Sequence, residues 1–495
     1  MPASLRIAIA ASECTPFAKS GGLADVSAAL ARALWKRGHD VRLFVPYYRS
    51  IDASGLETED GLAPFRLEFP DLSVALETRK APLEGAVNPD GEPLMVEFVN
   101  APDLFGRDSF YTDDPDEPVR WAAFSRAVLE ACQRTAWRPD VVHVNDWHTG
   151  LLPLYLRTHY AWDELFRDTR TLLSIHNLGY QGVFPASAVE AVGLGDARKY
   201  FDQDRLADGA VGFLETGLTH ASWLSTVSET YAREIQTAEH GMGLDELLRR
   251  RADHLVGIVN GIDAGEWDPC TDVHLPAHYD ADDLAGKAAC RAALLEEMEV
   301  APDPSGPVLG IVSRMTGQKG FELLPDILPV LLQSEDVRLV VLGSGEETHE
   351  RYFRWLREKL PHRVGLFVGY DEGLSHRVEA GSDVFLMPSR YEPCGLNQMY
   401  SMRYGTLPLV RATGGLADTV ERYDPDAGKG TGFVFYEFTS EALHDTLRHV
   451  LDVWRDRDAW RAMQDRGMRQ DFSWDGQVQR YEDLYAAVMA EMQSA

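Results

Sequence analysis

Short apolar runs alternate with segments of helical periodicity along almost the whole chain. In the first half, each apolar run predicts a strand and is followed by a stretch with the periodicity of an amphipathic helix. The predicted strands are residues 5–11, 41–45, 141–144, 171–175, 223–227 and 255–259. An irregular block at 55–100 carries alternating apolar residues, which favour hairpins inserted in this sheet or beside it. The pattern is typical of parallel βαβ units.

The same alternation starts afresh after residue 307. The predicted strands there are residues 308–312, 339–342, 366–368, 384–387, 407–410 and 433–436. Between the halves, prolines interrupt a polar stretch at 264–306 that lacks strand periodicity, apart from a predicted helix at 285–298. At 495 residues the chain exceeds what one core usually organises. We expect two doubly wound, Rossmann-like α/β domains, 1–263 and 307–475, joined by a linker at 264–306 and facing an interdomain cleft.

The sequence Gly-Gly-Leu-Ala-Asp occurs twice, at 21–25 and at 414–418, each time between a predicted strand and a predicted helix. Paired glycines at such a junction leave backbone N–H groups open to phosphate or sugar oxygens. The first copy is preceded by Lys19, which could meet the same ligand. The alternative is that each glycine pair only makes a tight turn. Neither copy matches the Walker loop or the dinucleotide fingerprint.

Two cations and a carboxylate follow predicted strands of the second half. Arg314 and Lys319 lie just after 308–312, where they could neutralise a diphosphate. Glu392 follows 384–387, where it could face a cationic sugar transition state. The alternatives are ordinary surface charge for the two cations and a favourable charge at a helix N-terminus for the glutamate.

Histidines lie at two strand ends of the first half, in the segments 143–148 and 176–180. Histidine is a common metal ligand, but these histidines have no partner at the helical spacing that a metal site would use. We therefore expect no metal.

Composition excludes several classes of partner. The formal net charge of −30 argues against nucleic acid and against an anionic membrane surface. The five cysteines are far apart and show no Cys-x-x-Cys spacing, which favours a reducing compartment. No apolar run has the length of a signal peptide core or a membrane span. We expect a cytoplasmic, soluble protein, and the pattern favours no particular oligomeric state.

These segments, taken together, closely resemble the bacterial glycogen synthases and the related plant starch synthases. The most specific parts are 19–26 and 388–420, and the resemblance runs in order through nearly the whole chain. It implies the GT-B fold of the glycosyltransferases, with a terminal helix at about 476–492 packing back on the first domain. It also implies a retaining transfer of glucose from ADP-glucose to the non-reducing-end 4-hydroxyl of an α-1,4-glucan, without a metal or a cofactor.

The resemblance also implies roles for particular residues. Arg314 and Lys319 would hold the diphosphate and its leaving charge, and Tyr370 would stack on the adenine. Glu392 would bind the transferred glucose, and His176 would contact the same sugar. Further donor contacts are implied for Lys19, Gly22, Cys394, Gly395, Leu396, Thr413, Gly414 and Gly415. Acceptor or sugar contacts are implied for Asp25, Asp146, His148, Asn177 and Asn260.

The chain departs from related patterns at two positions. Tyr400 stands where many GT-B transferases carry a second glutamate, and Glu215 stands where the family leads us to expect lysine. Because phosphate-binding residues do not read the base, a transferase that uses UDP-glucose or another acceptor remains an alternative. A catalytically silent glucan- or nucleotide-binding protein is the alternative from a different class.

Overall fold

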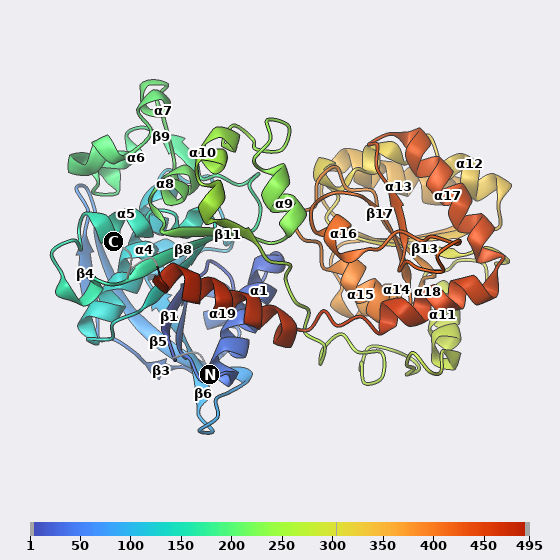
Figure 1. The fold of residues 1–495 in the computed structure, drawn as a ribbon, viewed down its shortest axis with the longest axis horizontal. Helices are drawn as coiled ribbons and strands as arrows, with labels where there is room; N and C mark the ends of the chain where they lie inside the picture. Colours follow the sequence, from blue (N-terminus) through green and yellow to red (C-terminus); the bar gives the residue numbers. More distant parts are fainter. Residues whose placement is uncertain (1–3, 303, 491–495) are drawn as a thin grey trace. The chain divides into compact units, whose positions relative to one another are not determined.

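The computed structural model describes residues 4–302 and 304–490, which divide into two compact units (Figure 1). The first unit holds residues 4–227, 232–261 and 474–490. The second holds 228–231 and 262–473, so the chain passes from one to the other more than once.

The first unit is built on one large sheet. Its strands are β1 (Arg6–Ala10), β2 (Asp40–Pro46), β3 (Glu59–Asp60), β4 (Phe65–Glu68), β5 (Ser73–Val87), β6 (Pro93–Asn100), β7 (Val141–Asn145), β8 (Arg170–Ile175), β11 (Trp223–Thr226) and β12 (Leu255–Gly257). Among the described residues they are ordered β12-β11-β8-β7-β1-β2-β6-β5-β3, with β4 beside β5. β1 pairs in parallel with β2 and β7, whereas β3 to β6 form the predicted antiparallel hairpins. A second, small sheet pairs β9 (Val183–Pro185) with β10 (Ala210–Gly212).

Helices connect these strands. They are α1 (Gly22–Lys36), α2 (Arg49–Ala53), α3 (Pro102–Phe105), α4 (Glu117–Arg134), α5 (Leu152–Arg157), α6 (Ala188–Ala191), α7 (Gln203–Ala207), α8 (Phe213–His220) and α10 (Asp245–Arg250). Helix α9 (Glu229–Glu234) begins in residues of the second unit and ends in residues of the first. The C-terminal helix α19 (Trp474–Ala490) also belongs to this unit.

The second unit has a wholly parallel sheet. Its strands are β13 (Val308–Val312), β14 (Arg338–Gly343), β15 (Val364–Val368), β16 (Val384–Met387), β17 (Leu407–Arg411) and β18 (Phe433–Phe435), in the order β15-β14-β13-β16-β17-β18. The helices are α11 (Ala285–Glu297), α12 (Leu328–Ser334), α13 (Glu347–Lys359), α14 (Glu372–Gly381), α15 (Asn397–Arg403), α16 (Gly414–Thr419), α17 (Ser440–Trp454) and α18 (Arg457–Met468). Successive residues of β14 pack into different apolar cores, Leu339 in one and Val340 in the other. Helices therefore cover both faces of the sheet.

Strand order places the ligand loops in each unit. The strand order reverses at the first strand of each sheet, between β1 and β7 in one unit and between β13 and β16 in the other. At such a point successive connections leave toward opposite faces, and a crevice opens beyond the carboxyl ends of the two strands. The loops after β1, β7, β13 and β16 are therefore the places to look for function. The predicted doubly wound α/β class is confirmed.

The segment 264–306, predicted as a linker, lies within the second unit. Its helix α11 packs on α14, where Leu294 lies directly against Gly381. The buried Lys287 ammonium donates to the carbonyl oxygens of Ala380 and Tyr404, both at 2.9 Å. The linker prediction is therefore wrong. It failed because only a few residues of the segment, such as Lys287 and Leu294, make buried contacts, and they lie among prolines and polar residues.

Helix α19 is tied to the first unit by buried polar contacts. The hydroxyl of Tyr485 lies 2.8 Å from Nδ1 of His143 on β7, and both side chains are buried. Glu482 accepts from Arg37 at 3.1 Å and lies 3.0 Å from Nε2 of His39. The last long helix therefore contributes to the first unit although it is the last element of the chain (Figure 1).

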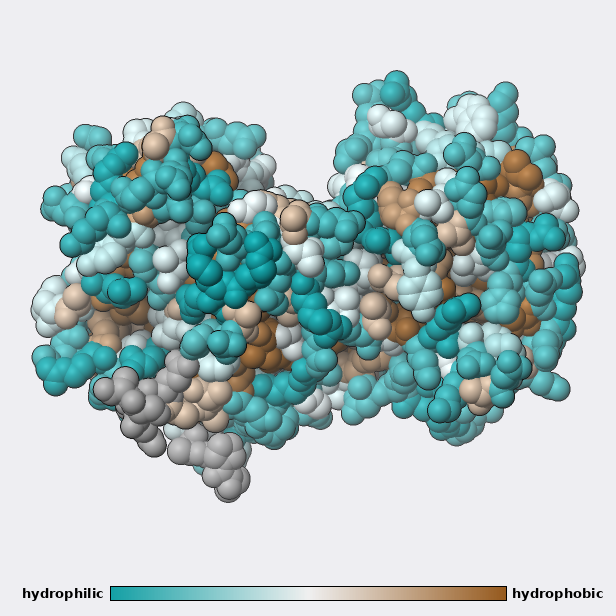
Figure 2. All heavy atoms as spheres, turned by 45° about the horizontal axis from the view of Figure 1, so that its top comes forward, coloured by the Kyte–Doolittle hydropathy of each residue, from teal (hydrophilic) through white to brown (hydrophobic). Residues whose placement is uncertain are grey.

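Hydrophilic residues cover most of the face drawn in Figure 2, and hydrophobic residues show there only in small, separate areas. The excess of 78 acidic over 48 basic residues fits this surface. Among the described residues, no helix combines the length and the apolar character that crossing a membrane requires.

Replacing Tyr485 by phenylalanine tests the attachment of α19. Tyr485→Phe leaves Nδ1 of the buried His143 without its partner, so the free energy of unfolding should fall by about 1–3 kcal/mol. Denaturant titration measures this change. Tyr436→Phe is the control, because Tyr436 is exposed, and it should change stability by less than about 0.5 kcal/mol. Equal effects of the two substitutions would contradict the assignment.

Candidate active site

A partly buried ion pair lies at the strand reversal of the second unit. Lys319, from the loop after β13, donates to both carboxylate oxygens of Glu392, at 3.0 and 2.7 Å. The hydroxyl of Ser389, which follows β16, donates to the same carboxylate at 2.9 Å. Glu392 is only 5% exposed. Three groups that follow the two central strands thus meet at one point, two of them predicted from the sequence.

Glycine makes this meeting possible. Gly320, next to Lys319, has a φ of 71°, and a Cβ atom there would come within 2.0 Å of the carbonyl oxygen of Pro388. Any side chain would force the two loops apart. Gly343, the last residue of β14, acts in the same way, because a Cβ there would lie 1.9 Å from the carbonyl oxygen of Ser313. That turn serves close packing.

The second Gly-Gly-Leu-Ala-Asp copy packs directly on the Glu392 loop. A Cβ on Gly414 would meet the carbonyl oxygen of Glu392 at 1.9 Å, and one on Gly415 would meet that of Cys394 at 2.1 Å. The N–H of Gly415 donates to the carbonyl oxygens of Glu392 and Pro393, both at 3.1 Å. The prediction that both glycines leave their N–H groups open to a ligand is therefore wrong for Gly415. Close approach of backbones explains the glycine pair.

The other predicted donor residues of the second unit also follow its strands. Arg314 is exposed at the end of β13, and its guanidinium forms no ion pair within the part of the chain that the structure describes. Tyr370 follows β15 with 75% of its surface exposed. Thr413 is buried before α16, and Gly395, between Cys394 and Leu396, turns the chain with a φ of 70°. Cys394, Gly395 and Leu396 lie in the loop between Glu392 and α15.

In the first unit, Glu13 organises the loop between β1 and α1. Its buried carboxylate accepts hydrogen bonds from the backbone N–H and hydroxyl of Ser20, the N–H of Gly21 at 3.2 Å and the hydroxyl of Tyr111. Further along the loop, Lys19 forms an ion pair with Asp25 at 2.9 Å. The predicted residue Lys19 thus lies on a loop that a buried carboxylate holds in place, and the predicted residues Gly22 and Asp25 lie in the first turn of the helix α1 that follows.

Asp146 follows β7 in a strained backbone conformation with a φ of 55°. Its carboxylate accepts from the backbone N–H of His176 at 2.8 Å, which joins the ends of β7 and β8. Burial raises the pKa of the Asp146 carboxyl to about 7, against the lowering effect of the N–H groups of His176 and Asn177. The site therefore contains a carboxyl group that titrates near neutral pH.

His176 is an uncharged group with a defined tautomer. Burial lowers the pKa of His176 to about 4, so the imidazole is neutral at pH 7. Its Nε2 lies 2.9 Å from Oδ1 of Asn145, whose amide nitrogen donates to the carbonyl oxygen of Ala10 at 3.0 Å. That second bond orients the amide, so Nε2 carries the proton. Nδ1 is left as a hydrogen-bond acceptor.

The remaining predicted residues of the first unit differ in their surroundings. His148 is buried with its ring 4.0 Å from that of Trp147 and 4.7 Å from that of Tyr111, and burial lowers its pKa well below the usual range. Asn260 is buried beyond β12, and its Oδ1 accepts no hydrogen bond from the described residues. His143, from the same motif as His148, binds α19 instead and is structural.

Sequence reasoning missed Glu13 and Tyr111. Glu13 could have been found, because it is the one acidic residue among the small and apolar residues that end the predicted strand 5–11 and directly follow it. Tyr111 carried none. It lies 98 positions from Glu13 in a loop without periodicity.

The two departures from the family pattern have structural partners. Glu215 forms an ion pair of 2.6 Å with Arg205, and burial raises the pKa of Glu215. Tyr400 is buried with its ring stacked at 3.8 Å on that of Trp267.

Among the described residues, Glu266, Glu372 and His376 form the one group that could hold a metal ion, with ligand atoms within 4.8 Å of one another. Both glutamates are exposed, and Nδ1 of His376 is already 2.7 Å from Asp272. None of the three is a predicted site residue. The strand-end clusters offer cations and neutral hydrogen-bonding groups, a set suited to binding a polyhydroxylated, anionic substrate.

Comparison with known proteins identifies the family of both units. The family described as "Starch synthase catalytic domain" matches residues 6–250, and "Glycosyl transferases group 1" matches residues 296–464. The chain is 47% identical to a glycogen synthase of Anaeromyxobacter dehalogenans, over 97% of this chain and 98% of the relative. It is 43% identical to a glycogen synthase of Koribacter versatilis, over 97% and 98% of the two chains.

Solved structures agree. The catalytic domain of starch synthase IV from Arabidopsis thaliana, bound to ADP and acarbose, is similar with a TM-score of 0.87 and 31% identity, over 99% of this chain and 100% of that one. A sucrose-phosphate synthase from Thermosynechococcus elongatus shares the fold, with a TM-score of 0.60 and 17% identity, over 98% of this chain and 100% of that one. The expected GT-B fold of two Rossmann-like domains is confirmed. The protein belongs to the glycogen and starch synthase family of glycosyltransferases, as the sequence resemblance predicted.

Proposed function

We propose that this glucosyltransferase, which elongates a glucan, takes glucose from ADP-glucose. The acceptor is the 4-hydroxyl at the non-reducing end of an α-1,4-glucan such as glycogen, and the anomeric configuration is retained. The observation that carries the proposal is the Lys319–Glu392 pair at the strand reversal of the second unit, 2.7 Å apart, with Arg314 at the end of the same strand as Lys319. The similar starch synthase IV domain with ADP and acarbose bound supports both substrates.

The second unit binds the donor in this proposal. As the bond between glucose and the diphosphate breaks, negative charge grows on the leaving ADP and positive charge on the sugar. Lys319 and Arg314 neutralise the first, and the Glu392 carboxylate stabilises the second. Tyr370 stacks on the adenine with its exposed ring. Cys394, Gly395, Leu396 and Thr413, from the loops before α15 and α16, complete the donor contacts together with Gly414 at the start of α16.

The first unit supplies sugar contacts. Nδ1 of the neutral His176 accepts a hydrogen bond from a hydroxyl of the transferred glucose, since its Nε2 donates to Asn145. The Oδ1 of Asn260, which is buried without a hydrogen-bond donor among the described residues, is a second acceptor of this kind. Asp25, Asp146, His148 and Asn177 complete the proposed acceptor and sugar contacts, while Lys19 and Gly22 bind the donor.

Neither a metal nor another cofactor is needed in this proposal, because protein cations face the leaving diphosphate. The net charge of −30 supports a neutral glucan as the macromolecular partner. It argues against nucleic acid and against a membrane surface, which are both anionic. The five cysteines are all free thiols, which supports the cytoplasm as the compartment.

The donor is tested by the initial rate of labelled glucose incorporation into glycogen, from ADP-glucose and UDP-glucose side by side, with a chelator throughout. We expect kcat/KM to favour ADP-glucose by more than about tenfold. We also expect the chelator to leave the rate unchanged. A preference for UDP-glucose would overturn the donor assignment, loss of activity with the chelator would overturn metal independence, and no incorporation from either donor would favour a silent binding protein.

The raised pKa of Asp146 predicts a pH-dependent stability. The folded-state pKa of about 7 lies above the unfolded value near 4, so stability is present at low pH and is lost as pH rises through 7. Between about pH 5.5 and pH 8, the wild type should lose roughly 2 kcal/mol of unfolding free energy relative to Asp146→Asn.

Urea titrations of both proteins at several pH values measure this difference. The exposed carboxyl of Asp103 provides a control, and Asp103→Asn should follow the wild-type pH profile. Parallel profiles for the wild type and Asp146→Asn would show that the Asp146 carboxyl titrates in its ordinary range.

A further inference from the structure

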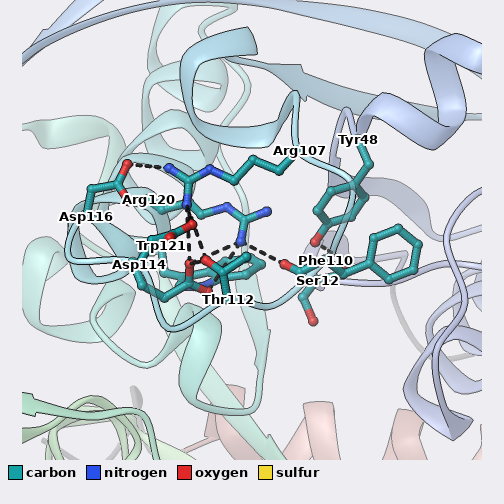
Figure 3. A network of polar contacts seen from close by, with 10 residues as sticks. Ser12, Tyr48, Arg107, Phe110, Thr112, Asp114, Asp116, Arg120 and Trp121 are labelled. Atoms are coloured by element: carbon teal, nitrogen blue, oxygen red, sulfur yellow. Dashed lines mark hydrogen bonds and ion pairs between the residues drawn. The ribbon is translucent and has the colours of Figure 1, made fainter.

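A cluster of two arginines around a buried glutamate lies beside the loop that carries Tyr111 (Figure 3). We call Arg107, Glu117 and Arg120 the arginine cluster. Glu117 and Arg120 begin helix α4, and both are buried. Arg120 donates to the two carboxylate oxygens of Glu117 at 3.3 and 3.1 Å, and the indole of Trp121 donates to the same carboxylate at 2.8 Å. The buried charge of Glu117 is therefore compensated.

The arginine cluster holds the residues on both sides of Tyr111. Arg120 donates to the carbonyl oxygen of Phe110 at 2.8 Å. The hydroxyl of Thr112 donates to Glu117 at 2.7 Å and accepts from Arg107 at 3.2 Å. Figure 3 shows these contacts converging on the loop. The backbone of Tyr111 is therefore fixed from its two neighbours.

Arg107 closes the far end of the loop. It forms an ion pair of 2.9 Å with Asp114 and a second one with Asp116, directly before α4. Residues 106–116 between α3 and α4 are thus tied at several places, although they form no helix or strand.

Tyr111 connects the arginine cluster to residues 11–21 between β1 and α1, which we call the glycine loop. Its hydroxyl donates to Glu13 and lies 2.9 Å from the hydroxyl of Ser12. Glu13 in turn accepts from the backbone N–H groups of Ser20 and Gly21. A continuous set of side-chain and backbone contacts therefore runs from the arginine cluster through Tyr111 and Glu13 to the loop that carries Lys19 and ends directly before Gly22.

We propose that Arg107, Glu117 and Arg120 are positioning residues for substrate binding. They fix Tyr111 so that its hydroxyl holds Glu13, and Glu13 holds the glycine loop in the conformation that binds the donor. A loop that is ordered before binding loses less conformational entropy when the substrate arrives. The proposal rests on the proposed function only in assigning this loop to the sugar-nucleotide donor.

The kinetic test uses Arg107, whose side chain is 20% exposed, because removing Glu117 or Arg120 would leave an unpaired buried charge. Arg107→Ala and Tyr111→Phe should each raise the KM for the donor about five- to tenfold, with kcat within about twofold of the wild type. The double variant should exceed the KM of Tyr111→Phe by less than about twofold, because both substitutions break the same path.

Arg49→Ala is the matched control. Arg49 holds the same loop through an exposed ion pair of 3.0 Å with Asp108, which does not lead to Tyr111, so its KM and kcat should stay unchanged. An unchanged KM in Arg107→Ala would overturn the proposal. So would a lower kcat at constant KM, which indicates lost active enzyme, or a double variant whose effect is the product of the two single effects.

Hydrogen–deuterium exchange of the substrate-free protein gives a readout that does not depend on the reaction. Exchange at residues 19–25 should be faster in Arg107→Ala and in Tyr111→Phe than in the wild type and in Arg49→Ala. Equal exchange in all four proteins would overturn the proposal even if the enzyme is active. Faster exchange in a protein that turns over neither donor would instead leave the path standing and remove the proposed function.

Discussion

A carboxylate buried at the end of a parallel sheet needs a cation and hydrogen-bond donors around it, and Glu392 has both. Lys319 and Ser389 face it from the loops after β13 and β16. For this to happen, the two loops must approach within contact distance, which Gly320 allows because it has no side chain. The strand order places these two loops together, so fold, loop sequence and charge pair depend on one another.

The first unit also contains a buried carboxylate at a strand end, but its partners are of a different kind. Glu13 is also a buried carboxylate beyond a central strand, but backbone N–H groups and hydroxyls surround it. Its charge therefore orders a loop, whereas the charge of Glu392 is balanced by a side chain that a ligand can engage. This difference explains why we assign catalysis to the pair in the second unit and substrate positioning to Glu13.

Much of the fold could be predicted from the sequence, because buried parallel strands form continuous apolar runs. The runs predicted at 141–144 and 308–312 correspond to β7 and β13. The segment 264–306 was predicted wrongly as a linker because few of its residues, among them Lys287 and Leu294, make buried contacts, and they lie among polar residues. Residues in the loops that follow strands, such as Lys319 and Glu392, could also be predicted. Tyr111 could not, since only the folded chain brings it to Glu13.

The central claim is that the ammonium group of Lys319 stabilises the charge that develops on the leaving diphosphate. The most direct test is the kcat of Lys319→Ala with the donor that the wild type prefers, beside Lys359→Ala, which removes an exposed lysine of α13. The account predicts that kcat of Lys319→Ala, measured well below its thermal midpoint, falls on the order of 10²-fold or more. Its thermal midpoint falls as well, because the buried Glu392 carboxylate loses its cation, whereas Lys359→Ala behaves as the wild type in both measurements. A kcat of Lys319→Ala near that of the wild type would contradict the account.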